Sequence, residues 1–107
     1  MSQQNTNQNN SNAHITFIGG GNMGRALISG LLANGFEPNQ ISVVEANATT
    51  ALKLYEDFGV QGIGALEQIA FDFTKNNVVV MAIKPQDFNV VAKGLASKLK
   101  QIGRAHV

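Results

Sequence analysis

A glycine-rich segment between two apolar segments limits the possible folds of this chain more than any other feature. The segment Gly19-Gly20-Gly21-Asn22-Met23-Gly24 follows the apolar residues of 15–18 and precedes apolar residues at helical spacing. In Gly19-x-Gly21-x-x-Gly24, the first glycine permits a tight turn, the second allows a phosphate near the backbone, and the third allows a helix to pack closely on a strand. Because helix N-termini bind phosphates, this strand-turn-helix context predicts a dinucleotide-binding turn.

The hydrophobic pattern after this turn alternates between helical and strand character. Such alternation predicts an α/β fold with a Rossmann-type, doubly wound parallel sheet. An unbroken apolar run such as Val78–Ile83 is typical of a strand covered on both faces. The other expected elements are a strand over 15–18, a helix over 23–34 ended by Gly35, a strand over 41–44, a helix over 48–58, a short strand over 59–62, a short helix over 65–71 and a helix over 86–100.

Helical spacing also predicts which side chains face the core. These are expected to be Met23, Leu27, Gly30, Leu31 and Asn34 in the first helix, Leu52, Tyr55 and Phe58 in the second, and Phe88, Val91, Ala92, Leu95 and Leu99 in the last.

Composition narrows the class of protein. The chain has 107 residues, 44% of them hydrophobic and 14% charged, which is typical of one small globular domain. Its net charge of +1 comes without a basic cluster, so nucleic acid is not an expected partner. No apolar run approaches the roughly 20 residues that a membrane helix needs. With no cysteine and two distant histidines, neither a disulfide nor a metal site is expected, and the cytoplasm is the expected compartment.

An acidic residue stands where the glycine turn requires one. Glu45 follows the second strand, 21 residues after Gly24, and a carboxylate there accepts hydrogen bonds from the adenosine ribose. It favours NAD, since it repels a 2′-phosphate, and residues 46–50 contain no arginine. The alternative for Glu45 is a solvated glutamate. Lys53 is the nearest cation that could reach a 2′-phosphate, although its pattern favours a surface lysine.

Two segments together resemble the pyrroline-5-carboxylate reductase family: residues 15–24, ITFIGGGNMG, and the segment Ala82-Ile83-Lys84-Pro85-Gln86. The resemblance extends from His14 to about Lys100. It implies that Asn22 and Met23 line the cofactor phosphates and that Ala82, Ile83, Lys84 and Pro85 run along the nicotinamide, although Lys84 reads equally as a solvated loop lysine. The cofactor-binding set is therefore predicted to be Gly19, Gly21, Asn22, Met23, Gly24, Glu45, Ala82, Ile83, Lys84 and Pro85.

The resemblance implies NAD(P)H-dependent reduction of 1-pyrroline-5-carboxylate to proline. Many family members prefer NADPH and carry polar or basic residues where this chain has Glu45-Ala46-Asn47, so the choice between NADP and NAD stays open. In the family a C-terminal helical domain forms the substrate pocket and the dimer, which implies a homo-oligomeric parent protein and no catalytic residue within this chain. The alternatives are a stand-alone NAD(P)-binding regulatory module and the N-terminal domain of a β-hydroxyacid dehydrogenase or an F420-dependent NADP reductase.

The two ends of the chain differ from its middle. Residues 1–13 are expected to form a disordered polar tail, because they offer almost no apolar surface to bury. Residues 14–101 are expected to form a Rossmann domain truncated before its later strands, because no fifth strand follows the last helix. The last six residues, IGRAHV, match the translation of a common sequencing adapter, ATC GGA AGA GCA CAC GTC. Residues 102–107 are therefore predicted to be non-native.

Overall fold

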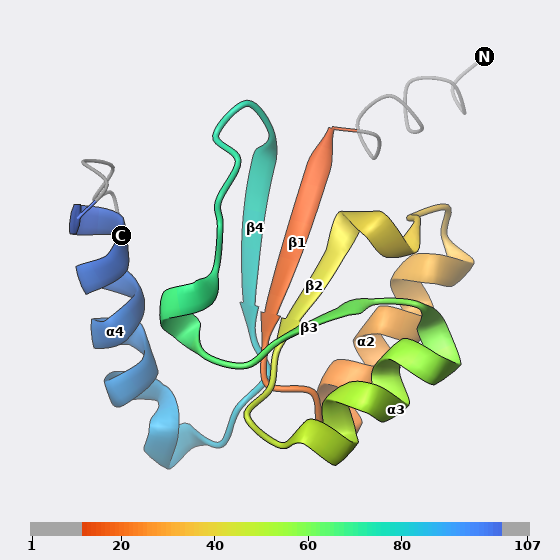
Figure 1. The fold of residues 1–107 in the computed structure, drawn as a ribbon, viewed down its shortest axis with the longest axis horizontal. Helices are drawn as coiled ribbons and strands as arrows, with labels where there is room; N and C mark the ends of the chain where they lie inside the picture. Colours follow the sequence, from red (N-terminus) through yellow and green to blue (C-terminus); the bar gives the residue numbers. More distant parts are fainter. Residues whose placement is uncertain (1–11, 102–107) are drawn as a thin grey trace.

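The computed structural model describes residues 12–101 of the chain, which form a parallel sheet with flanking helices (Figure 1). The strands are β1 (Ala13–Ile18), β2 (Ile41–Val44), β3 (Gln61–Ile63) and β4 (Asn76–Met81). The α-helices are α2 (Asn22–Ala33), α3 (Ala48–Phe58) and α4 (Phe88–Gln101), and the 3-10 helices are η1 (Pro38–Gln40), η2 (Leu66–Gln68) and η3 (Pro85–Asp87). The predicted Rossmann-type α/β fold is confirmed.

The strand order β3-β2-β1-β4 places β1 between two parallel neighbours. At its carboxyl end Ile18 is in register with Val44 of β2 and with Met81 of β4. The connection that leaves the carboxyl end of β1 leads through α2 to β2, whereas the one that leaves the carboxyl end of β4 leads to α4 on the other side (Figure 1). The connections therefore diverge beyond Ile18, and such a switch point in a doubly wound sheet is where ligands bind.

The strand β4 differs from its prediction at both ends. It spans Asn76–Met81, whereas the apolar run predicted 78–83. The pairing with β1 explains the difference, because Ala13 pairs with Asn76 and Ile18 pairs with Met81. The Ala82 N–H donates to the Ile18 carbonyl at 2.9 Å, and Gly19 then turns the chain away toward α2. Beyond that point β1 offers no partner, and the sheet ends despite the continuing apolar sequence.

The other boundaries vary in their agreement with the pattern. The second strand and second helix lie where predicted, at 41–44 and 48–58. The third strand spans 61–63 in place of 59–62, because Gly59 adopts a left-handed conformation that ends α3. The helix predicted over 65–71 is wrong: only the 3-10 turn η2 forms, and the backbone is extended again at Ile69. The last helix begins at Phe88, after the turn η3, in place of residue 86.

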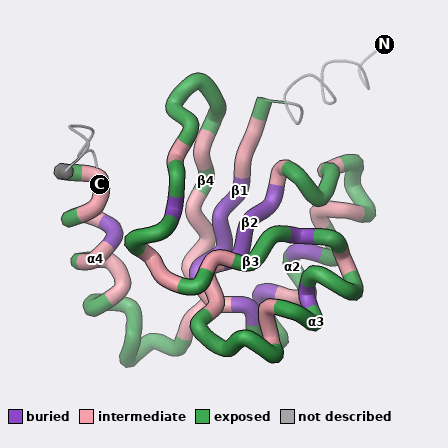
Figure 2. Tube along the Cα trace, in the orientation of Figure 1, coloured by how far each residue is buried: buried purple, intermediate pink, exposed green. Residues whose placement is uncertain are grey.

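The hydrophobic core lies between one face of the sheet and the helices α2 and α3. Figure 2 shows the buried residues concentrated on β1 and β2, with further buried residues on α2 and α3. The alternate residues Ile15 and Phe17 of β1 contribute to this face, as expected from the two-residue period of a strand. The cluster comprises Ile15, Phe17, Ile28, Ile41, Val43, Leu54 and Val60, with Leu31, Leu32, Phe36, Phe58, Val80 and Ala82 packed against it.

Several side chains predicted to face inward do not. In α3, Leu52 is 57% exposed and Tyr55 is 62% exposed, whereas Leu54 is 1% exposed. In α2, Ile28 rather than Met23 or Leu27 enters the core. Leu31 of α2 and Phe58 of α3 do pack against the core, as predicted. In α2, the close packing of Gly24 on the glycine turn fixes the rotation of the helix and brings Ile28 inward.

The predicted face of α2 lies along an apolar groove. This groove is lined by Ile15, Phe17, Ala26, Leu27, Gly30, Leu31, Asn34, Val78 and Val80. In α4, Leu95 is buried and Val91, Ala92 and Leu99 are half-buried, but Phe88 is 50% exposed because it begins the helix beyond η3.

The end of α2 follows its prediction closely. Asn34 caps the helix and Gly35 adopts a φ of +100°. The Phe36 N–H donates to the Leu31 carbonyl at 3.1 Å, and the Gly35 N–H donates to the Leu32 carbonyl at 3.4 Å. These two bonds form a Schellman motif, which satisfies the last carbonyls of the helix.

The predicted tails lie mostly outside the described residues, since 1–11 and 102–107 are not described. Ala13, which was assigned to the polar tail, belongs to β1 and pairs with Asn76. Among residues 12–101, no helix has the combined length and apolarity that crossing a membrane requires.

The burial of Leu54 predicts its contribution to stability. We expect Leu54→Ala to lower the free energy of unfolding by about 2–5 kcal/mol, because it removes a large side chain from the core. Leu52→Ala, two residues away in the same helix, should change it by less than about 0.5 kcal/mol. Urea unfolding followed by circular dichroism measures both. Equal losses would contradict the observed rotation of α3.

The position of β4 predicts self-association. Among the strands that the structure describes, β4 is terminal in the sheet, and Val78 is 47% exposed. Apolar edge strands pair with other chains, and a lysine on the edge opposes such pairing. We expect the apparent mass on a sizing column to rise with concentration, and Val78→Lys to suppress this rise. Val90→Lys, at a 75% exposed position of α4, should leave it unchanged.

Candidate dinucleotide-binding site

The glycine turn touches the segment that follows β4. Gly19 has a φ of +98°, and a Cβ on it would lie 2.5 Å from the Ala82 carbonyl oxygen and 3.1 Å from Ile83 Cγ2. A Cβ on Gly24 would lie 2.7 Å from the Gly19 carbonyl oxygen. These two positions therefore require glycine: one for its conformation and close approach, the other because α2 packs directly on the turn.

Gly21 has different surroundings, because a Cβ on it would meet no atom within 4 Å. Gly21 is the N-cap of α2, and no side chain accepts a hydrogen bond from the first turn of that helix. The first turn also contains no acidic residue. The first N–H groups of α2 thus face open space beside Gly21, which fits a pyrophosphate held by backbone N–H groups and the helix dipole.

Glu45 connects the end of β2 to the glycine turn. Its backbone N–H donates to the Ile63 carbonyl at 2.8 Å, which extends the sheet by one bond. Its Oε1 accepts from the Gly20 N–H at 2.9 Å and its Oε2 accepts from the Asn47 N–H at 3.0 Å. Each carboxylate oxygen retains capacity for a further hydrogen bond. Glu45 can therefore hold two loops together and still accept from a ribose hydroxyl.

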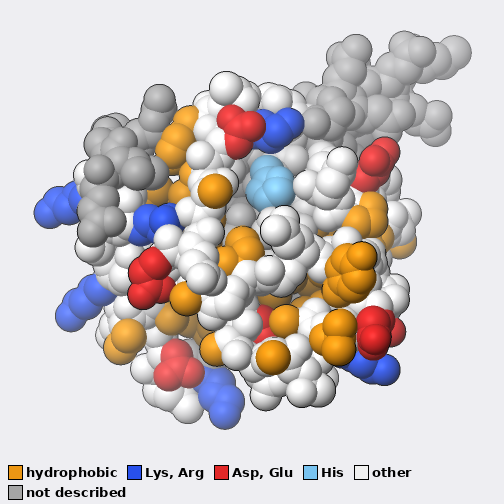
Figure 3. All heavy atoms as spheres, in the orientation of Figure 1, with side chains coloured by type: hydrophobic (Ala, Val, Ile, Leu, Met, Phe, Trp, Pro, Cys, Tyr) orange, Lys and Arg blue, Asp and Glu red, His pale blue; other side chains and the backbone are white. Residues whose placement is uncertain are grey.

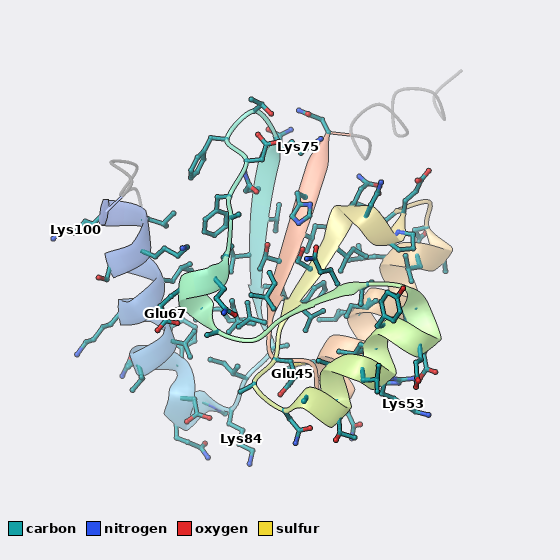
Figure 4. The ribbon with its side chains drawn as sticks, in the orientation of Figure 1. Glu45, Lys53, Glu67, Lys75, Lys84 and Lys100 are labelled. Carbon is teal, nitrogen blue, oxygen red and sulfur yellow. The ribbon has the colours of Figure 1, made fainter. Side chains whose placement is uncertain are left out.

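The structure brings the sequence-predicted site residues to one edge of the sheet. Gly19, Gly21 and Gly24 form the turn, with Asn22 and Met23 exposed at the start of α2. Ala82 and Ile83 are half-buried against the turn, Lys84 is exposed, and Pro85 begins η3. Figure 4 shows Glu45 and Lys84 at the same end of the sheet, with Lys84 directed away from it.

A cavity that was not predicted lies between the beginnings of α2 and α3. Its volume is about 310 Å³, and its lining comprises Gly20, Gly21, Asn22, Arg25, Thr49, Thr50 and Lys53. Lys53 was considered as a phosphate contact from its sequence position, whereas Arg25, Thr49 and Thr50 were not. The signal for Arg25 was a cation in the first turn of a helix, where the dipole disfavours it unless an anion is near.

The Arg25 side chain is held in place by α3. Its Nη2 donates to Asp57 Oδ2, and its Cζ lies 4.9 Å from the centre of the Phe58 ring. The hydrogen bond from Arg25, with smaller contributions from the charges of Arg25 and Lys53, lowers the pKa of Asp57 below its usual value. The guanidinium is therefore oriented by an ion pair and by a cation–π contact.

On the face shown in Figure 3, basic and acidic side chains are mixed around the rim. Within residues 12–101, no group of three His, Asp or Glu side chains could hold a metal ion.

Comparison with known proteins gives consistent results. Residues 14–102 match the family described as NADP oxidoreductase, coenzyme F420-dependent. The chain is 41% identical over 81 residues to a pyrroline-5-carboxylate reductase of Vibrio alginolyticus, covering 76% of this chain and 29% of that protein. It is 40% identical over 84 residues to the pyrroline-5-carboxylate reductase of Pasteurella multocida, covering 78% and 30%. The structure of a pyrroline-5-carboxylate reductase from Coxiella burnetii matches with a TM-score of 0.69 and 36% identity, covering 85% of this chain and 31% of that one.

The contact between Gly24 and the glycine turn can be tested within α2. We expect Gly24→Ala to lower the free energy of unfolding by about 1–3 kcal/mol, because the new methyl group meets the Gly19 carbonyl. Gly30→Ala is the matched control, since its methyl group meets nothing within 4 Å. It should raise stability by about 0.5–1 kcal/mol through helix propensity. Thermal unfolding measures both, and a stabilising Gly24→Ala would refute the close packing.

Proposed function

The chain belongs to the family described as NADP oxidoreductase, coenzyme F420-dependent, and we propose that it binds a nicotinamide dinucleotide as the cofactor-binding part of a pyrroline-5-carboxylate reductase. One observation carries the binding proposal. The open face of Gly21 adjoins the free N-terminus of α2, at the point where the connections of β1 and β4 diverge. A pyrophosphate has room there, and backbone donors are available to it.

Each predicted residue has a role in this proposal. The backbone at Gly21, Asn22 and Met23 binds the pyrophosphate, while Gly19 and Gly24 shape the turn. Glu45 accepts from the adenosine ribose while it holds Gly20 and Asn47. The segment 82–85 borders the nicotinamide half of the cofactor. The close approach of Ala82 and Ile83 to Gly19 of the turn supports this placement. Lys84 is exposed and adds charge at the same edge.

The proposed reaction is the reduction of 1-pyrroline-5-carboxylate, a cyclic imine, to proline. The bound cofactor supplies the hydride, and the residues of this chain bind and orient it. The chain spans about 30% of the length of its pyrroline-5-carboxylate reductase relatives, so the substrate site and catalytic groups are assigned to the longer protein. We assign no catalytic role to residues 12–101.

Cofactor binding can be tested with one substitution in the turn. We expect the chain to enhance NADH or NADPH fluorescence in a titration, and Gly21→Val to weaken the binding at least about tenfold. The valine side chain would fill the space of the pyrophosphate, although its Cβ touches no protein atom and the backbone at Gly21 is extended.

Thermal unfolding without cofactor is the control for this substitution, because the variant should keep the wild-type midpoint. Unchanged affinity in a folded Gly21→Val variant would exclude the proposed pyrophosphate position. Absence of binding by the wild-type chain to either dinucleotide would contradict the binding proposal.

The reductase part of the proposal depends on the gene. We expect its nucleotide sequence to continue past the codon of Gln101 into a segment similar to the rest of the pyrroline-5-carboxylate reductases. A native stop codon near that point, or a continuation into an unrelated domain, would contradict this part alone.

A further inference from the structure

The two faces of the sheet differ in character near its amino end. Ile15 and Phe17 of β1 belong to the hydrophobic core. His14 and Thr16 alternate with them along the strand and therefore lie on the opposite face. Ser42 of β2 is in register with Thr16 and shares this face, and both hydroxyl-bearing residues are buried. A half-buried titratable ring thus adjoins two buried hydroxyl groups, directly behind the core side of the same strands.

A hydrogen bond joins the His14 ring to β2. Its Nε2 lies 3.0 Å from the Ser42 hydroxyl oxygen. A neutral ring can accept from this hydroxyl group or donate to it, whereas a protonated ring can only donate. Because Ser42 is 6% exposed, its hydroxyl group has little access to water that could replace the bond. The bond therefore connects β1 and β2 at a position where its loss is costly.

A hydrogen-bonded turn, formed by residues 72–75, lies on the β4 side of His14. Asn77 of β4 is in register with His14, and its Nδ2 donates to the Asp72 carbonyl at 2.8 Å and to the Lys75 carbonyl at 3.2 Å. The Asp72 carboxylate also accepts two hydrogen bonds from within the turn, at 3.0 and 2.6 Å. The strand residue beside His14 therefore holds the turn that carries the nearest charges.

The charges around His14 favour its neutral ring. Burial lowers the pKa of His14 most, the positive charge of Lys75 lowers it further, and the negative charge of Asp72 opposes them. Within residues 12–101 these are the two charged side chains that act on the ring, and its partner on β2 is an uncharged hydroxyl group. Figure 4 shows Lys75 at the amino ends of β1 and β4. A proton on His14 would thus place a second positive charge on a half-buried group beside Lys75.

We propose that His14 is a pH-sensitive switch at the amino end of the sheet: its neutral ring lets β1, β2 and the turn 72–75 close together, and its protonation loosens that turn. The glycine turn lies at the carboxyl end of the same strands, so this inference goes beyond the proposed function and does not depend on it. Because folding favours the neutral ring, the stabilisation is present above the pKa of an unfolded histidine. It is lost as the pH falls through the lower pKa of the folded chain.

The pH dependence of stability tests this switch. We expect the urea midpoint of the full chain to fall between about pH 7.5 and about pH 5.5, a window that lies above the titration of ordinary carboxylates. His14→Gln keeps a side chain that can bond to Ser42 but cannot gain a proton, so its midpoint should stay nearly constant. His106→Gln, at the other histidine of the chain, should retain the wild-type fall. A constant wild-type midpoint, or an undiminished fall in His14→Gln, would overturn the proposal.

An NMR titration of the His14 ring tests the same idea without changing the ring. We expect its pKa to lie below the usual histidine value, and Lys75→Met to raise it by removing a like charge. Lys84→Met removes the same charge at the opposite end of the sheet and should leave the pKa unchanged (Figure 4). An unshifted wild-type pKa, or equal effects of the two substitutions, would contradict the proposed surroundings of the ring.

The same titration shows whether the turn responds to the proton. The Lys75 N–H donates within the turn, and the Asn76 N–H donates to the residue before β1. We expect both amide resonances to move with the midpoint of the His14 ring, whereas the Gly19 amide, at the other end of β1, should not follow it. If the ring titrates while the amides of the turn stay constant, protonation leaves the turn closed and His14 is not a switch.

Discussion

The close contact between Gly19 and the Ala82 carbonyl fixes the geometry on which the site depends. It occurs where β1 and β4 end side by side, one residue beyond the last paired residues, Ile18 and Met81. A side chain at Gly19 would push the glycine turn away from the segment after β4. It would also displace the surface on which α2 packs, since Gly24 of α2 lies against the Gly19 carbonyl. The position of the α2 N-terminus over the sheet edge therefore follows from the absence of two side chains.

Glu45 adds the second connection to this arrangement. The glycine turn is held on one side by the sheet, through the Gly19 N–H and the Val44 carbonyl at 2.9 Å, and on the other by the Glu45 carboxylate at Gly20. The same carboxylate holds Asn47, whose side chain caps α3 by accepting from the Thr50 N–H. One side chain thus sets the relation between the starts of two helices, and the cavity between them results from it.

The sequence predicted the elements better than their packing. The strand 41–44 and the helix 48–58 follow from hydrophobic patterns that lie inside each segment, although Gly59, which ends the helix, was assigned to the third strand. The limits of β4 could not be predicted in this way, because the length of β1 and the turn at Gly19 determine them. The burial of Leu54 in place of Leu52 could not be predicted either. The hydrophobic period indicates that one face of the helix is apolar, but tertiary contacts decide which of the apolar residues are buried.

The same distinction applies to the site. Residue spacing was sufficient to find the glycine turn and Glu45, because both belong to one strand-turn-helix-strand unit. The cavity joins Arg25 of one helix to Thr49 and Lys53 of the next, and no local pattern relates them. The surroundings of Glu45 therefore could not be predicted from the position of this residue in the sequence alone. Cations and hydroxyl groups line the cavity between the two neighbouring helix starts, and neither helix has an acidic residue in its first turn to balance its dipole.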